Sequence, residues 1–132
     1  MNDIYKDLIL DFLHHLGKER NLSKNTISAY GRDLERFFTF LVDYDPTLVK
    51  NLNRINRHTL RHFLSSEFER KDIRPGRNGK NITARTIARE LATIKSFFKY
   101  LVLVEKIKNN PSIHVHTPKI EKQIPNFVQL NK

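Results

Sequence analysis

The 132-residue sequence contains no cysteine and no tryptophan, and it has only four glycines and five prolines. Without cysteine the chain can form neither disulfides nor a thiolate metal site, which favours a reducing compartment. Charged residues interrupt every apolar run before it reaches the ~18 residues that a membrane span requires. The acidic start of the chain is also unlike the basic start of a signal peptide. We therefore expect a cytoplasmic protein that does not enter a membrane.

The sequence also lacks the motifs by which common enzymes are recognised. There is no Gly-rich phosphate loop, no GxSxG and no HExxH, and the acidic residues show no paired spacing. The run HTLRH at 58–62 has the residue types for acid–base chemistry and for binding a phosphate. However, Leu60 fits the core face of its helix, and no nucleophile lies nearby in sequence. We therefore expect no catalytic residue, no metal and no cofactor in this chain.

The net charge of +10 is concentrated in one part of the chain. Residues 1–53 carry seven Lys or Arg against eight Asp or Glu, whereas residues 54–99 carry twelve against four. A folded surface usually mixes both signs, so a block of one sign favours a polyanionic partner. Nucleic acid is the leading candidate. An anionic membrane surface and a basic surface without any partner remain as alternatives.

Apolar residues recur at helical spacing, and no stretch shows the alternation of a β-strand. The hydrophobic content of 39%, which includes nine phenylalanines, is typical of a folded domain with one core. Helices are predicted at residues 3–19, 24–42, 57–70 and 83–104. Ser23 should be the N-cap of the second, and Thr83 or one of its neighbours that of the fourth. Residues 43–56 should form a loop with one short turn. The expected fold class is therefore an all-α, compact bundle of four to five helices without a β-sheet.

The helix predicted at 83–104 divides sharply into two faces. Its apolar stripe consists of Ile87, Leu91, Ile94, Phe98 and Leu101. The opposite side is small, polar and cationic, and it carries Arg85, Arg89 and Ser96, flanked by Ala92 and Lys99. The helix at 24–42 has a similar design, with an apolar stripe that includes Tyr30 and a far side that carries Asn25, Ser28, Arg32, Arg36 and Thr39. Each helix should therefore bury one face and present the other to a partner.

The segment KDIRPGRNGKNI at 71–82 contains a Pro-Gly and an Asn-Gly pair, which are typical of turns. It also carries four cations, at Lys71, Arg74, Arg77 and Lys80. Such a loop can reach a phosphate backbone, but the same composition is typical of a mobile surface loop. The sequence leaves both interpretations open.

Three features of the chain, taken together, resemble a known family. They are NLSKNTISAYGRDLERFFTFL at 21–41, ARTIARELATIKSFFKYL at 84–101, and the later pairs Asn110-Pro111 and Pro118-Lys119. This order resembles the N-terminal domain of tyrosine recombinases, the group of phage integrases and Xer proteins. The likeness covers nearly the whole chain.

The resemblance implies a SAM-like core-binding domain that forms one half of a clamp around double-stranded DNA. Residues 1–116 would form this helical DNA-binding domain, and 117–132 would form a linker to a catalytic domain that is absent here. The parent protein would be a tyrosine recombinase whose protomers associate on DNA, whereas the isolated domain is expected to be monomeric and without enzyme activity. The competing interpretation is a helical protein–protein interaction module that does not bind DNA.

The same resemblance assigns DNA contacts, mainly to phosphates, to two helices. From the helix at 24–42, the expected contacts are Lys24, Asn25, Thr26, Tyr30 and Arg32. From the helix at 83–104, they are Thr83, Arg85, Thr86, Arg89, Ser96 and Lys99.

The chain departs from the family pattern in two respects. The connection at 71–82 is longer than usual, so it inherits no role from the family. The catalytic motifs of the family, an arginine in a TGLRxSE-like sequence and a tyrosine shortly after LGH, are missing. The HTLRH run resembles the catalytic HxLRH box, but it lies before the linker, and we interpret it as a coincidence.

Overall fold

The computed structural model describes residues 4–117, and it contains helices and turns but no strand in that range. Its elements are α1 (Ile4–Glu19), α2 (Lys24–Tyr44), α3 (Thr47–Lys50), the 3-10 helix η1 (Leu52–Arg54), α4 (Arg57–Glu69) and α5 (Ala84–Leu103). The only pairing of strand type in these residues is a single bridge between Lys71 and Asn81. The predicted all-α fold class is confirmed.

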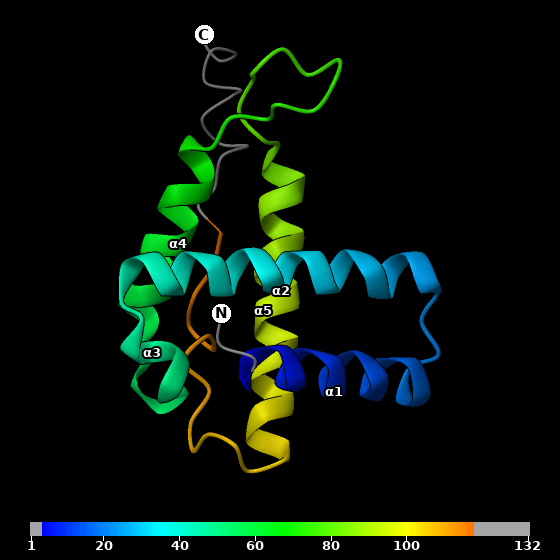
Figure 1. Cartoon of the computed structure of the whole chain (residues 1–132), viewed down its shortest axis with the longest axis vertical. Helices are drawn as coiled ribbons and strands as arrows, with labels where there is room; N and C mark the ends of the chain where they lie inside the picture. The colour runs from blue at the N-terminus through cyan, green and yellow to red at the C-terminus, as the bar shows by residue number, and fades with distance from the viewer. Residues whose placement is uncertain (1–3, 118–132) are drawn as a thin grey trace, which may run out of the picture.

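The helices are arranged around α5, which stands along the longest axis of the molecule (Figure 1). α1 and α2 form an antiparallel hairpin that crosses α5, while α4 runs along another side of it. The segment after α5 turns back and passes between α4 and α5. α5 therefore packs against three other helices, and its remaining side faces solvent.

Six phenylalanines make up the centre of the core. They are Phe12, Phe37, Phe38, Phe63, Phe97 and Phe98, all buried. Most of their contacts are edge to face, as between Phe37 and Phe63 at 5.3 Å and between Phe38 and Phe97 at 5.8 Å between ring centroids. Such pairs add about 0.5–1.5 kcal/mol each beyond the burial of area. Because the rings come from α1, α2, α4 and α5, they lock the four longer helices into one core.

The predicted apolar stripe of α5 is buried as expected, but the buried face is wider than predicted. Glu90, Thr93 and Phe97 are buried in addition to the stripe. The widening follows from the contacts of α5 with α1, α2 and α4, which together cover more than one narrow side. Two of these additional residues are polar, and both take part in ionic networks described below.

Both predicted N-caps are confirmed, and the two have the same geometry. The Ser23 hydroxyl accepts a hydrogen bond from the Thr26 N–H at 3.2 Å, and the Thr83 hydroxyl accepts one from the Thr86 N–H at 3.1 Å. Capping of this kind stabilises a helix by about 1 kcal/mol. The starts of α2 and α5 are therefore firmly defined.

The prediction of a loop with one turn at 43–56 was too simple. α2 continues to Tyr44, and the segment then forms both α3 and η1. The Asp45 carboxylate accepts hydrogen bonds from the Thr47 N–H and hydroxyl, and Asn51 caps η1 through the Asn53 N–H. These local bonds, together with the burial of apolar residues, stabilise helices too short for a hydrophobic period to be visible.

The Asn110-Pro111 pair begins a turn after α5. The Asn110 side chain accepts hydrogen bonds from the Ser112 N–H at 2.8 Å and from its hydroxyl at 2.6 Å. Ile107 and Val115, on either side of this turn, are buried against the core. The segment is therefore part of the domain as far as Thr117. The predicted linker lies almost entirely outside the described residues, so the boundary remains a prediction.

Candidate nucleic-acid interface

None of the eleven residues expected to contact DNA is buried. Lys24, Asn25 and Arg32 of α2 are exposed, and so are Thr83, Arg85, Arg89 and Lys99 in and before α5. Thr26, Tyr30, Thr86 and Ser96 are partly exposed. The structure therefore leaves each of them accessible, but it does not gather them into one patch.

α2 and α5 meet where Asp33 contacts Arg89. From this crossing, the N-terminal part of each helix extends away from the other. We call residues 24–32 of α2 and 84–89 of α5 the two N-terminal arms. Figure 1 shows the arm of α2 projecting to one side of α5, and the arm of α5 running upward behind it. Nine of the eleven expected residues lie on these arms or their caps, and one of them, Arg89, lies where the arms join.

Asp33 and Arg89 form the ionic link at this junction. Asp33 is 2% exposed, and its two oxygens accept hydrogen bonds from the Arg89 Nε at 3.0 Å and Nη2 at 2.5 Å. The Thr93 hydroxyl donates a third bond to the same carboxylate at 2.9 Å. Hydrogen bonding to Asp33 raises the pKa of Arg89 above its ordinary value. This two-point pairing fixes the guanidinium in position and compensates a buried carboxylate.

Arg89 thus has a structural role that the sequence analysis did not foresee. Its side chain remains 44% exposed, and the N–H groups not directed at Asp33 stay available to a partner. The signal was present in the sequence, since Asp33 lies one position from Leu34 on the core side of its helix. An acidic residue there requires a cation from a neighbouring helix.

The other cations of the arms are unpaired within the described part of the chain. Lys24, Arg32 and Arg85 form no ion pair with any residue of 4–117. Of the acidic groups near the crossing, Asp33 binds Arg89, and Glu67 binds Arg70 with Arg36 at 3.7 Å, whereas the exposed Glu35 forms no ion pair with residues 4–117. The arms therefore present a positive surface that is not neutralised from within.

A second ionic network lies between α4 and α5. Arg70 donates from Nε to Glu67 at 3.1 Å and from Nη2 to Glu90 at 3.2 Å. Both carboxyl groups are buried. Burial, followed by the adjacent Glu67, raises the pKa of Glu90 to about 8. Glu90 therefore carries a proton at neutral pH, and the network is a packing element beside Arg89 rather than a charged site.

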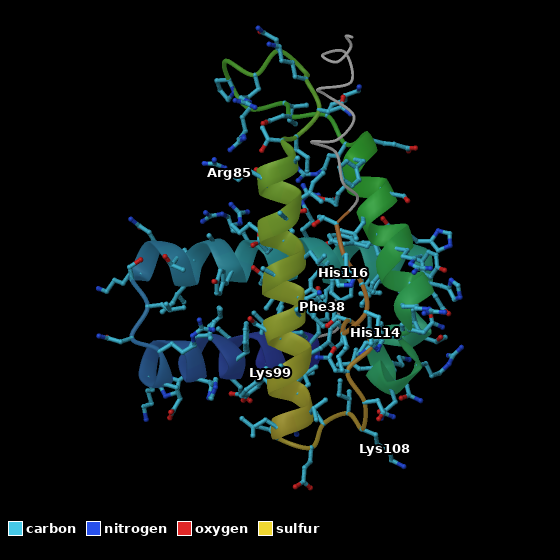
Figure 2. The ribbon with its side chains drawn as sticks, turned by 180° about the vertical axis from the view of Figure 1, so that it is seen from behind. Phe38, Arg85, Lys99, Lys108, His114 and His116 are labelled. Atoms are coloured by element: carbon cyan, nitrogen blue, oxygen red, sulfur yellow. The ribbon has the colours of Figure 1, made fainter. Side chains whose placement is uncertain are left out.

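Ser96 and Lys99 lie in a different part of the molecule. They line a cleft between α5 and the end of α1, together with Phe12, His15 and Arg20. Lys99 is fourteen residues from Arg85, a distance of about 21 Å along the helix axis. Figure 2 shows the two side chains toward opposite ends of α5. They share the exposed side of one helix, but only Arg85 belongs to the arms.

The HTLRH run at 58–62 lies on α4. His58, Arg61 and His62 are exposed on α4, whereas Leu60 between them is buried in the core. Residues 4–117 contain no group of three or more His, Asp or Glu side chains placed to hold a metal ion. None of the helices in that range is both long and apolar enough to cross a membrane.

Comparison with known proteins agrees with this picture. Residues 9–104 match the family described as phage integrase, N-terminal SAM-like domain. The chain is 39% identical over 125 residues to tyrosine recombinase XerD of Listeria monocytogenes, an alignment that covers 95% of this chain and 38% of that protein. It is 35% identical over 120 residues to XerD of Oceanobacillus iheyensis, covering 91% and 36% of the two chains.

A further relative is tyrosine recombinase XerC of Chlorobaculum tepidum, which is 35% identical over 127 residues. That alignment covers 89% of this chain and 33% of the relative, so the chain spans only about a third of the length of these proteins. No solved structure matches the chain significantly. The match over most of its helical residues nevertheless shows that the chain belongs to the family of phage-integrase N-terminal SAM-like domains, as the sequence resemblance predicted.

Proposed function

We propose that the chain binds double-stranded DNA as the N-terminal part of a site-specific tyrosine recombinase. The observation that carries this proposal is the pair of exposed N-terminal arms. Arg89 and Asp33 fix their junction, and their other cations, Lys24, Arg32 and Arg85, form no ion pair with residues 4–117. A rigid, positive, two-armed surface suits the backbone of a duplex, where charges repeat at regular spacing.

The residues of the arms would contact mainly phosphates. Lys24 and Arg32 of α2 and Arg85 of α5 supply unpaired charges, and Arg89 supplies a guanidinium whose orientation is set in advance. Asn25 is exposed on the arm of α2 and has the amide that can pair with an adenine edge. Thr26, Thr83 and Thr86 lie at the helix starts, where the helix dipole also favours a phosphate. Tyr30 is partly exposed, and its hydroxyl would reach a phosphate.

Ser96 and Lys99 would form a separate contact, because they lie beyond the crossing with α1 and α2. In this proposal they touch DNA only if the duplex follows the exposed side of α5 past the arms. Their contribution should therefore be smaller than that of Arg85.

The recombination reaction itself is assigned to the parent protein and not to this chain. The named relatives are tyrosine recombinases, and this chain matches only 33–38% of the length of each. The chain carries none of the expected catalytic motifs, so it would contribute binding and positioning. Other protomers of the parent protein would be its partners on DNA, while the isolated domain would remain monomeric.

The proposal is tested by reversing two charges on the arms. Arg32→Glu with Arg85→Glu changes no ion pair within the described residues, so the fold should persist. We expect the Kd for a 30-base-pair duplex, measured by fluorescence anisotropy in low salt, to rise roughly a hundredfold. Binding by the unmodified chain should also weaken steeply as salt rises.

The matched control is Arg57→Glu with Arg61→Glu, which makes the same change of charge on the exposed side of α4. This control should bind nearly as well as the unmodified chain. An equal loss in both double variants would show that only net charge matters, and full binding by a folded Arg32/Arg85 variant would refute the proposal.

A protein–protein function is the second candidate, and one observation favours it. Leu103 is 66% exposed beside the cleft that Phe12, Leu16 and Tyr100 line at the end of α5. Such an apolar edge is a potential docking surface. This function predicts a stable oligomer that ignores DNA and that Leu103→Glu dissociates, which light scattering after gel filtration would detect.

A further inference from the structure

The geometry points to a third DNA-binding element, the hairpin formed by residues 70–82, which we infer extends the contact beyond the start of α5 along the phosphate backbone. This inference rests on the proposed DNA-binding function and adds to it a part of the surface that the family resemblance left without a role.

The segment is a defined hairpin and not an irregular loop. Asp72 N–H donates to the Lys80 carbonyl at 2.6 Å, and Ile82 N–H donates to the Arg70 carbonyl at 3.3 Å. The Asn81 amide donates to the Phe68 carbonyl at 2.6 Å, which ties the base of the hairpin to the end of α4. Gly76 and Gly79, with φ of 85° and 69°, allow the chain to reverse. The turn is therefore held in one geometry at its base and along its length.

A single buried carboxylate organises the cations of this hairpin. Asp72 is 4% exposed and accepts hydrogen bonds from the Arg74 N–H, Nε and Nη2, the last at 2.6 Å. The Arg77 Nε donates to the same carboxylate at 3.0 Å. Hydrogen bonding by Arg74 holds the pKa of Asp72 well below its usual range, so the carboxylate stays ionised.

The hairpin has more positive charge than this carboxylate needs. Arg74 already donates a hydrogen bond to each of the two carboxylate oxygens of Asp72. Arg77 nevertheless adds a second guanidinium, and Lys71 and Lys80 add two further charges. Asp72 is the only acidic residue between 71 and 82, so the balance there is four cations against one anion. The Arg74 side chain is 72% exposed, and the Nη groups of Arg77 have no partner among residues 4–117. The excess charge is thus both positioned and available.

The hairpin lies next to the arm of α5, where its cations would extend the positive surface of the two N-terminal arms. It directly precedes Arg85, and Figures 1 and 2 both show it leaning toward the side of α5 from which the arm of α2 projects. Only the base of the hairpin is paired, by the bridge between Lys71 and Asn81, and residues 74–79 beyond it form turns and bends. The cations of the hairpin would therefore contact phosphates next to those contacted by the arms.

The inference is tested by removing two charges of the hairpin, of which Arg77 also donates one hydrogen bond to Asp72. Arg77→Gln with Lys80→Gln leaves the pairing of Asp72 with Arg74 intact. We expect the Kd for duplex DNA to rise roughly tenfold at 50 mM salt, and the slope of log K against log salt to fall by about two. The size of the binding site, measured on duplexes of increasing length, should shrink.

Lys106→Gln with Lys108→Gln provides the matched control, because these exposed lysines lie at the other end of α5 (Figure 2). This variant should keep the Kd, the salt slope and the site size of the unmodified chain. If the unmodified chain does not bind DNA, the proposed function itself fails. If it binds, and the hairpin variant matches the control in all three measurements, the proposed function stands and the hairpin inference is overturned.

Discussion

The two buried ionic networks of α5 differ in how acid and base are matched. In the first, one carboxylate, Asp33, meets one guanidinium, Arg89, and the Thr93 hydroxyl completes its hydrogen bonds. In the second, Glu67 and Glu90 share Arg70, and only the distant Arg36 at 3.7 Å from Glu67 adds charge. The first network has one acid and one base, and we call it the balanced network. The second places two acids beside Arg70 and Arg36, and we call it the acidic network.

The acidic network differs from the balanced one in the pKa of one of its acids. Burial, followed by the adjacent Glu67, raises the pKa of Glu90 to about 8, so Glu90 keeps its proton at neutral pH. Its Oε1 atom also receives no hydrogen bond from any donor in residues 5–117. Both networks reach solvent through an arginine, since the side chain of Arg89 is 44% exposed and that of Arg36 is 40% exposed. Only Arg89, however, lies on one of the two N-terminal arms.

The largest effect is expected from breaking the balanced network. Asp33→Ala leaves the Arg89 guanidinium without its acceptor, and it leaves the Thr93 hydroxyl with only the Arg89 carbonyl at 3.0 Å. Loss of one partner of a buried pair costs about 3–5 kcal/mol, and the half-exposed position of Arg89 places this case near the lower end. Urea denaturation should show the loss in the free energy of unfolding.

The control for this variant is Glu35→Ala, an exposed acid two residues away on the same helix with no ion pair in the described residues. Its effect should stay within about 0.5 kcal/mol. Equal stabilities of the two variants would mean that the Asp33 link does not hold the arms together.

The acidic network should make the free energy of unfolding depend on pH. Because the folded chain holds the Glu90 proton up to about pH 8 while the unfolded chain releases it near 4.5, stability should fall as pH rises between these values. Glu90→Gln imitates the protonated form and removes this dependence. The variant should therefore resemble the unmodified chain at pH 5 and gain stability relative to it at pH 9.

Urea denaturation at pH 5, 7 and 9 measures this difference, with the exposed Glu69→Gln as its control. The control should follow the pH profile of the unmodified chain. A constant difference between Glu90→Gln and the unmodified chain at all three pH values would contradict protonation of Glu90 in the folded state.

The sequence could predict the local features of these helices but not the contacts of the networks between helices. The stripe from Ile87 to Leu101 and the two caps were visible, because they depend on local spacing along one helix. The pairing of Asp33 with Arg89 spans 56 residues, and it depends on the angle at which α2 crosses α5. Local patterns could suggest that Asp33 needs a cation, but they could not choose Arg89 over Arg85.

For the candidate interface, the sequence could predict which residues are exposed, but it could not predict which of them lie close together. The resemblance placed Ser96 and Lys99 with Arg85 on one side of α5, and the structure agrees about that side. It was the crossing of α1 and α2 over α5 that separated the first two residues from the arms. Similarly, the sequence showed four cations at 71–82, but not the burial of Asp72 that arranges two of them.

The smallest predicted effect isolates the third hydrogen bond of the balanced network. Thr93→Val keeps the shape of the side chain and removes the hydroxyl that donates to Asp33 at 2.9 Å. Because Arg89 still occupies both carboxylate oxygens, the loss should be about 1 kcal/mol in urea denaturation. Thr39→Val is the matched control, since that exposed hydroxyl bonds only the carbonyl of Glu35 in its own helix. A loss for Thr93→Val as large as that for Asp33→Ala would show that the hydroxyl, and not the guanidinium, is the main partner of the buried carboxylate.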